Sequence, residues 1–337
     1  MPEVNREASQ IKAGAVLSYI SMCLGFAISI AYTPIMLRLL GQSEYGLYSL
    51  VASVVSYLGL LNFGFGSAYI RYYSRYKVNN EVENIAKLNG MFMVIFSIIG
   101  LIAVLAGTVL VFNVRTIFGN KLSAGEFIKV KIIMAIMVFN MALSFFASVF
   151  NSNITANEKY IFQKTLQMFR LVVSPFVVLP VLLMGYKSVG MVVAATAINV
   201  IIEISNVVFC FKRMKMKLLF HKFDFQLMRE MAIFSSFIFL NIIVDQINWN
   251  VGKYIVGRFR GTVAVAIYGL AAQLNNYYMS LSTALSGVLV SRVNRMVAET
   301  DNNEELTNMF TRIAVRFSVI DLFFWGKNYF LSNNSLA

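Results

Sequence analysis

The sequence has little of what a soluble enzyme or a disulfide-bonded domain would need. Its 337 residues include only two cysteines and one histidine, and 13% of them are charged, against about 25% in an average soluble domain. Cys23 and Cys210 both lie in apolar runs, so no disulfide framework is indicated. His221 lies in a basic loop, and the sequence shows no phosphate-binding loop, metal-ligand cluster or nucleophile with a suitable base. We therefore expect neither an enzyme nor a metal or cofactor site.

Hydrophobic residues, by contrast, make up 58% of the chain. A water-soluble shape cannot bury that much apolar surface, because soluble domains are only about 45–50% apolar. The sequence is therefore that of an integral membrane protein. Its net charge of +13 would suggest nucleic acid as the partner of a soluble protein. In a membrane protein the same excess reports cytoplasmic loops rich in Lys and Arg, so no nucleic-acid partner is expected.

Eight apolar runs are long enough to cross a membrane as helices, which takes roughly 20 residues each. They span residues 14–37, 46–70, 88–113, 130–152, 165–185, 188–211, 231–257 and 262–291. A ninth run, 313–325, contains Arg316 and Asp321 and then turns polar. The runs lack the alternation of barrel strands, and the connections between them are too short for a separate domain. The predicted fold is all-α, a polytopic transmembrane helix bundle.

The distribution of basic residues predicts how the bundle is oriented. With residues 1–13 in the cytoplasm, the cytoplasmic side carries twice as many Lys and Arg residues as the outer side. The strongest single determinant is the run Lys212–Lys217, KRMKMK. This run is interpreted as a topology signal, and the alternative is that it recruits anionic lipid head groups.

The chain also matches itself at an offset of 220 residues. Leu37–Leu50 reads LRLLGQSEYGLYSL, and Gly257–Leu270 reads GRFRGTVAVAIYGL, which aligns Gly41 with Gly261 and Tyr48 with Tyr268. Each copy joins the end of one span to the start of the next. Because the offset covers six spans, the two copies face the same way, as in transporters built from parallel repeats. We therefore predict two parallel six-helix repeats, the second incomplete.

This repeat divides the chain into five parts. Residues 1–13 form a cytoplasmic N-terminus and residues 14–212 a first six-helix lobe, followed by a basic cytoplasmic loop at 213–230. An incomplete second lobe at 231–325 contains spans seven, eight and part of nine. Residues 326–337 are expected to be a polar, aberrant tail of a truncated or frameshifted product.

Two stretches carry a resemblance to a known family. Pro34–Tyr48 (PIMLRLLGQSEYGLY) and Leu60–Tyr76 (LLNFGFGSAYIRYYSRY) resemble the N-terminal signature of bacterial polysaccharide or O-antigen flippases. These belong to the multidrug/oligosaccharidyl-lipid/polysaccharide exporter superfamily. The resemblance implies a multi-pass protein of the bacterial inner membrane that moves undecaprenyl-diphosphate-linked oligosaccharide by alternating access. It also implies work alongside a polysaccharide polymerase and a chain-length regulator.

Polar residues within the spans are the candidates for a substrate cavity, because ionisable groups at bilayer depth are costly. Asn241, Asp245 and Asn248 follow i, i+4 and i+7 spacing and therefore share one helix face. The remaining candidates are Glu203, Arg170, Lys253, Gln273, Asn276 and Tyr277. Amides can bond sugar hydroxyls, Arg170 and Lys253 can bind phosphate, and Tyr277 can stack on a sugar ring. Asp245 or Glu203 can titrate and couple transport to an ion gradient.

Other interpretations stay open at this point. The polar groups can instead hydrogen-bond between helices and hold the bundle together, and Arg170 can snorkel to the interface. The alternative functions are a cation-coupled multidrug exporter of the same superfamily, a membrane enzyme of polysaccharide assembly, and an inactive truncated product.

Overall fold

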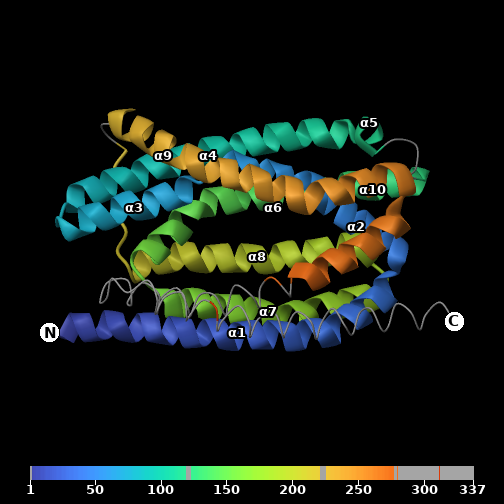
Figure 1. Ribbon diagram of the computed structural model, residues 1–337, viewed down its shortest axis with the longest axis horizontal. Coiled ribbons are helices and arrows are strands. Elements are labelled where there is room, and N and C mark those ends of the chain that lie inside the picture. The colour runs from blue at the N-terminus through green and yellow to red at the C-terminus, as the bar shows by residue number, and fades with distance from the viewer. Residues whose placement is uncertain (1, 119–122, 221–224, 277–278, 280–310, 312–337) are drawn as a thin grey trace. The chain divides into compact units, whose positions relative to one another are not determined.

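The computed structural model describes residues 2–118, 123–220, 225–276, 279 and 311. The chain divides into two units, Met1–Leu274 and Asn275–Ala337. In the first unit, every regular element among the described residues is a helix (Figure 1). Seven helical segments there are long and apolar enough to cross a membrane: Ile20–Leu40, Gln42–Val78, Val82–Phe112, Gly125–Ala156, Tyr160–Leu183, Lys187–Lys212 and Phe225–Arg260.

Seven of the eight predicted spans are thus confirmed. The eighth begins in a helix that covers residues 262–276, and the rest of it, like the ninth run, lies outside the described residues. Several observed helices are longer than predicted; the second runs to Val78, not to residue 70. A span predicted from an apolar run ends where Arg and Tyr enter the sequence. A helix, however, continues as long as its backbone hydrogen bonds are satisfied.

The first lobe is built from the helices before residue 213. α1 (Pro2–Leu40) packs along α7 (Tyr160–Leu183), while α6 (Ala124–Ala156) contacts both α4 (Val82–Phe112) and α8 (Lys187–Lys212), as Figure 1 shows. α5 is one short turn, Val114–Phe118. The largest core cluster lies where α3 (Phe65–Val78), α4 and α6 meet, and it buries Phe92, Phe96 and Phe150.

The second span is not one continuous α-helix. α2 (Gln42–Val55) passes into a 3₁₀ segment, η1 (Ser56–Asn62), and α3 begins after a break at Phe63 and Gly64. Both break residues adopt left-handed backbone conformations, with φ of 49° and 73°. A Cβ atom at Gly64 would lie 2.7 Å from Cγ2 of Ile238 on α9 (Phe225–Gln246). Glycine is required here for both reasons, since it alone tolerates the conformation freely and leaves room for the neighbouring helix.

A buried cluster of amides and phenols fastens α3, α4 and α6 together. The Asn153 amide donates to the Tyr69 hydroxyl over 2.7 Å, and that hydroxyl donates to Oδ1 of Asn89 over 2.5 Å. One turn further on, the Asn157 amide donates to the Tyr73 hydroxyl over 2.7 Å. Tyr69, Asn89 and Asn153 are at most 2% exposed. Buried polar groups need partners, and here three helices supply them to one another.

The predicted sequence repeat is visible in the backbone. Gly41 and Gly261 have φ of 84° and 82°, and each ends one helix and begins the next. The Gly41 amide donates to the carbonyl of Leu37, four residues earlier, and the Gly261 amide donates to that of Gly257. The same turn therefore recurs after 220 residues. The first copy joins α1 to α2, and the second joins α10 (Gly252–Arg260) to the helix at 262–276.

The two copies of this turn also touch each other. The Ser43 and Thr262 hydroxyls lie 3.2 Å apart, and a Cβ atom at Gly46 would collide with the Thr262 carbonyl oxygen. Ser49 packs directly on Gly269, its own counterpart in the repeat. A residue that meets its own equivalent is the mark of an isologous, two-fold-like interface. The contact supports the two-repeat architecture that the sequence predicted.

Candidate functional site

The structure places the nine predicted site residues in more than one location. Arg170 and Glu203 belong to the interface of α6, α7 and α8 within the first lobe. Asn241, Asp245 and Asn248 lie on α9 and on the π-helical turn η3 (Ile247–Val251) that follows it. Tyr277 lies outside the described residues, and Asn276 belongs to the second unit.

Arg170 lies at one end of a chain of amides that crosses the first lobe. Its guanidinium donates to Oδ1 of Asn199 on α8. The Asn199 amide donates in turn to Oδ1 of Asn140 on α6 over 2.7 Å, and to the Ser144 hydroxyl over 3.4 Å. Asn199 is buried whereas Arg170 is exposed. The buried Asn199 therefore positions an arginine that has further N–H donors available.

Glu203 is held by two amides, those of Asn151 and Asn206. Its Oε2 accepts from Asn151 and from Asn206, each over 3.1 Å, and the Asn206 amide also donates to Oδ1 of Asn151 over 2.9 Å. This half-buried triad joins α6 to α8. Asn199 and Asn206 thus form hydrogen bonds between helices, the alternative that the sequence left open for polar groups in the spans.

The polar residues of α9 point in two directions. Gln246 donates to the Ser56 carbonyl in η1 over 3.1 Å and accepts from Asn250 over 2.5 Å, so this stripe packs on the second span. The stripe of Asn241, Asp245 and Asn248 is instead exposed. Asn241 donates to a carbonyl of its own helix, that of Phe237. Among the described residues, no hydrogen bond or ion pair engages the Asp245 carboxylate.

This exposed stripe is the clearest candidate for a substrate pathway. It belongs to a segment that is long and apolar enough to cross a membrane. Amides and a carboxylate turned toward lipid would be expensive, so such groups in membrane helices face protein or a water-filled cavity. The stripe also borders a π-helical turn, a feature that frequently marks functional sites. Its arrangement can bond hydroxyl groups and attract a cation.

Lys253 and Gln273 lie beyond this stripe. Lys253 is half-buried on α10, and Gln273 accepts from the Tyr45 hydroxyl of the first repeat over 3.2 Å. Gln273 therefore takes part in the contact between the repeats. Sequence reasoning did not single out Asn140, Asn151 and Asn153, although their spacing along α6 was a usable signal: Asn140, Ser144 and Asn151 follow an i, i+4, i+11 pattern that keeps them on one face.

The comparisons with known proteins show a family and a fold. The model of the family described as "Polysaccharide biosynthesis protein" matches residues 11–293. The inward-facing form of a multidrug resistance MATE family transporter of the MOP superfamily superposes with a TM-score of 0.63 at 12% identity, over 82% of this chain and 63% of that one. An outward-facing form of such a transporter superposes with a TM-score of 0.55 at 13% identity, over 77% of this chain and 59% of that one. A MOP superfamily transporter from Pyrococcus furiosus superposes with a TM-score of 0.52 at 13% identity, over 78% of this chain and 60% of that one.

The chain thus spans less than two thirds of the length of these transporters. At such low identity the likeness shows the fold. No curated protein matches the sequence significantly.

Proposed function

The chain belongs to the polysaccharide biosynthesis protein family, and we propose that it serves to move a lipid-linked oligosaccharide across the bacterial inner membrane. Membership is the single observation that carries this proposal, because the family model covers most of the chain. It also confirms the resemblance seen in the sequence. The substrate we propose is an undecaprenyl-diphosphate-linked O-antigen or capsule repeat unit, delivered to a polymerase and its chain-length regulator. The N-terminus would lie in the cytoplasm.

The exposed stripe of α9 supplies the chemistry for a sugar. Asn241 and Asn248 offer donors and acceptors to hydroxyl groups, and Asp245 lies between them on the same face. Arg170 would contact the diphosphate, since one of its five N–H donors is engaged by Asn199 and phosphate recognition favours guanidinium. Lys253, Gln273, Asn276 and Tyr277 stay predictions from the sequence for the same pathway.

Of the two carboxylates, Asp245 is the better candidate for coupling transport to an ion gradient. Glu203 already accepts two amide hydrogen bonds and is tied into the packing of α6 on α8. Asp245 is exposed and is not engaged in that way. A carboxylate free to bind and release a cation is what coupling requires. We therefore assign ion coupling to Asp245 and a structural role to Glu203.

A second candidate is a cation-coupled multidrug exporter. It is favoured by the solved structures with this fold, since two of those described above are multidrug resistance transporters. An enzyme of polysaccharide assembly is disfavoured because the solved structures with this fold described above are those of transporters.

Deleting the gene separates these functions. Loss of a flippase should abolish surface polysaccharide while complete lipid-linked repeat units accumulate on the cytoplasmic leaflet. Loss of an assembly enzyme should leave those units incomplete, which mass spectrometry of extracted lipids would detect. Normal polysaccharide combined with raised ethidium accumulation would favour the multidrug exporter and contradict the proposal.

Asp245→Asn tests the proposed pathway. We expect transport of a fluorescent lipid-linked oligosaccharide into proteoliposomes to fall about tenfold or more, which corresponds to about 1.4 kcal/mol in the barrier. The amount of folded protein should be unchanged, because the side chain is exposed.

Glu230→Gln is the matched control, since it removes an exposed carboxylate from the same helix, near its first turn. Equal transport by the Asp245→Asn variant and the unmodified chain would remove Asp245 from the mechanism.

A further inference from the structure

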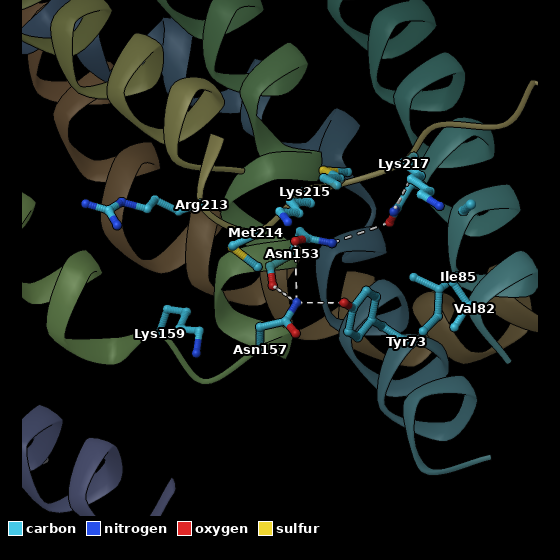
Figure 2. Close-up of a pocket in the computed structure, with 13 residues that line it drawn as sticks. Tyr73, Val82, Ile85, Asn153, Asn157, Lys159, Arg213, Met214, Lys215 and Lys217 are labelled. Atoms are coloured by element: carbon cyan, nitrogen blue, oxygen red, sulfur yellow. Dashed lines mark hydrogen bonds between the residues drawn. The ribbon is translucent and has the colours of Figure 1, made fainter. Parts of the chain in front are cut away.

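A basic pocket lies at one end of the first lobe, away from the exposed stripe of α9. Its volume is about 340 Å³, and Figure 2 shows the residues that line it. They come from the end of α3, the start of α4, the end of α6 and the segment 213–217 that follows α8. All these helix ends lie on the side that the charge distribution assigns to the cytoplasm.

The lining carries positive charge alone. Four cations contribute to it, Lys159, Arg213, Lys215 and Lys217, and no acidic side chain does. Within the part of the chain that the structure describes, none of the four side chains forms an ion pair. Like charges gathered around one cavity repel one another, so the pocket favours an anion that neutralises them.

The basic segment is held in place by packing. In the run KRMKMK, Met216 is buried in the core cluster of α3, α4 and α6, and Met214 packs against it. The Lys217 carbonyl accepts from the Asn89 amide over 2.9 Å, and the Leu219 amide donates to the Ala86 carbonyl over 3.0 Å. The methionines therefore anchor the segment, while the cations next to them in the sequence line the pocket. A topology signal needs only charge and would not require this anchoring.

The rest of the pocket lining combines polar amides with an apolar edge, as a site for a lipid phosphate and the start of its acyl chains would. Asn153 and Asn157 line the pocket. The Asn153 amide donates to Tyr69, and Figure 2 shows the Asn157 amide donating to Tyr73. Asn157 is only partly buried. Val82 and Ile85 of α4 add an apolar edge, and Val82 is 63% exposed. Cations beside exposed apolar side chains, at the ends of spanning helices, match the interface between head groups and acyl chains.

We propose that this pocket binds the phosphate head group of an anionic membrane lipid. Lys215 and Lys217 would pair with the phosphate, and Val82 would contact the lipid's apolar part. A bound lipid would neutralise the segment 213–217 and brace the start of the basic loop that leads to α9. The proposal does not depend on what the protein transports, so its failure would leave the proposed function untouched.

The test measures binding of phosphatidylglycerol to the purified full-length chain by native mass spectrometry, with phosphatidylcholine for comparison. Lys215→Gln combined with Lys217→Gln should weaken phosphatidylglycerol binding roughly 30-fold, from about a fivefold effect for each cation near an anionic lipid surface. Arg75→Gln combined with Lys77→Gln is the matched control, because it removes two exposed cations from the last turn of α3, outside the pocket. This control should bind the lipid normally.

Equal losses of phosphatidylglycerol binding in the two double variants would overturn the proposal. Binding would then depend on the total positive charge at that end of the molecule and not on the pocket. Equal retention of phosphatidylcholine and phosphatidylglycerol would overturn it as well. Soluble pyrophosphate provides the last comparison. If pyrophosphate displaces the lipid and binds more tightly through Lys215 and Lys217, the pocket serves a free phosphate and the lipid assignment is wrong.

Discussion

Single asparagines decide much of how the first lobe is held together. Asn153 joins α3 and α4 to α6 through one phenol, and Asn199 joins α6, α7 and α8 through Asn140 and Arg170. The sequence left open whether such amides bind substrate or bind one another. Asparagine has both donors and an acceptor, so either role is chemically possible. Burial shows that Asn153 and Asn199 bind other side chains of the protein, because both are at most 4% exposed.

Tyr69→Phe tests the buried cluster at this scale. Removing the hydroxyl leaves the Asn153 amide and Oδ1 of Asn89 without that partner, and an unsatisfied buried group costs about 1–3 kcal/mol. We expect the free energy of unfolding to fall by that amount in a detergent-denaturation experiment. Tyr72→Phe is the control, because the Tyr72 hydroxyl makes only a long hydrogen bond of 3.4 Å, to Glu230 near the surface. Equal stability of the two variants would contradict the role given to Tyr69.

The second span contains a break that its apolar run did not predict. Its apolar run predicted one helix, and the structure contains α2, a 3₁₀ segment and α3. Gly64 provides both the break in the helix and the close contact with α9. Composition alone could not distinguish a break from a continuous helix, because isolated glycines are common in membrane helices.

Gly64→Ala should disturb the contact between α3 and α9. The added Cβ meets Ile238 at 2.7 Å, and overpacking of this kind costs about 1–3 kcal/mol. The positive φ adds strain in the same direction. Gly59→Ala is the control in the same span, since its Cβ would meet no atom closer than 3.7 Å. A thermal unfolding scan should show a lowered midpoint for Gly64→Ala alone, and an unchanged midpoint would mean that the break is not required.

At the scale of the whole molecule, the contact between repeats is the feature that links sequence to architecture. Alignment at an offset of 220 found the pair Gly41 and Gly261, and the structure gives both the same backbone turn. What alignment could not give is that the two turns touch, with Gly46 against the Thr262 carbonyl and Ser49 on Gly269. Similarity between two segments carries no information on whether they meet.

A disulfide can test that contact directly. A Cβ atom at Gly269 would lie 3.7 Å from Cβ of Ser49, within the range of about 3.5–4.5 Å that a disulfide needs. Ser49→Cys with Gly269→Cys, in a Cys23→Ser background, should therefore cross-link on mild oxidation. Cleavage between the repeats by a protease, followed by reducing and non-reducing electrophoresis, would reveal it.

Adding Gly46→Ala to this variant should reduce cross-linking, because its Cβ collides with the Thr262 carbonyl. Gly25→Ala is the matched control, since its Cβ would meet only Leu171, no closer than 3.7 Å. A chain that fails to cross-link even without Gly46→Ala would contradict the interface.

Hydrophobicity and local similarity are properties of the chain read in order, and they were enough to predict the class of protein, the seven spans that the structure describes, the repeat and the family. Tertiary structure alone decided which polar groups meet. Glu44, Lys129 and Ser188 form a cluster that joins α2, α6 and α8. Likewise, Met214 and Met216 turn the segment 213–217 inward, so that its lysines line a pocket. The partners in such contacts lie many tens of residues apart, and only packing in three dimensions selects them.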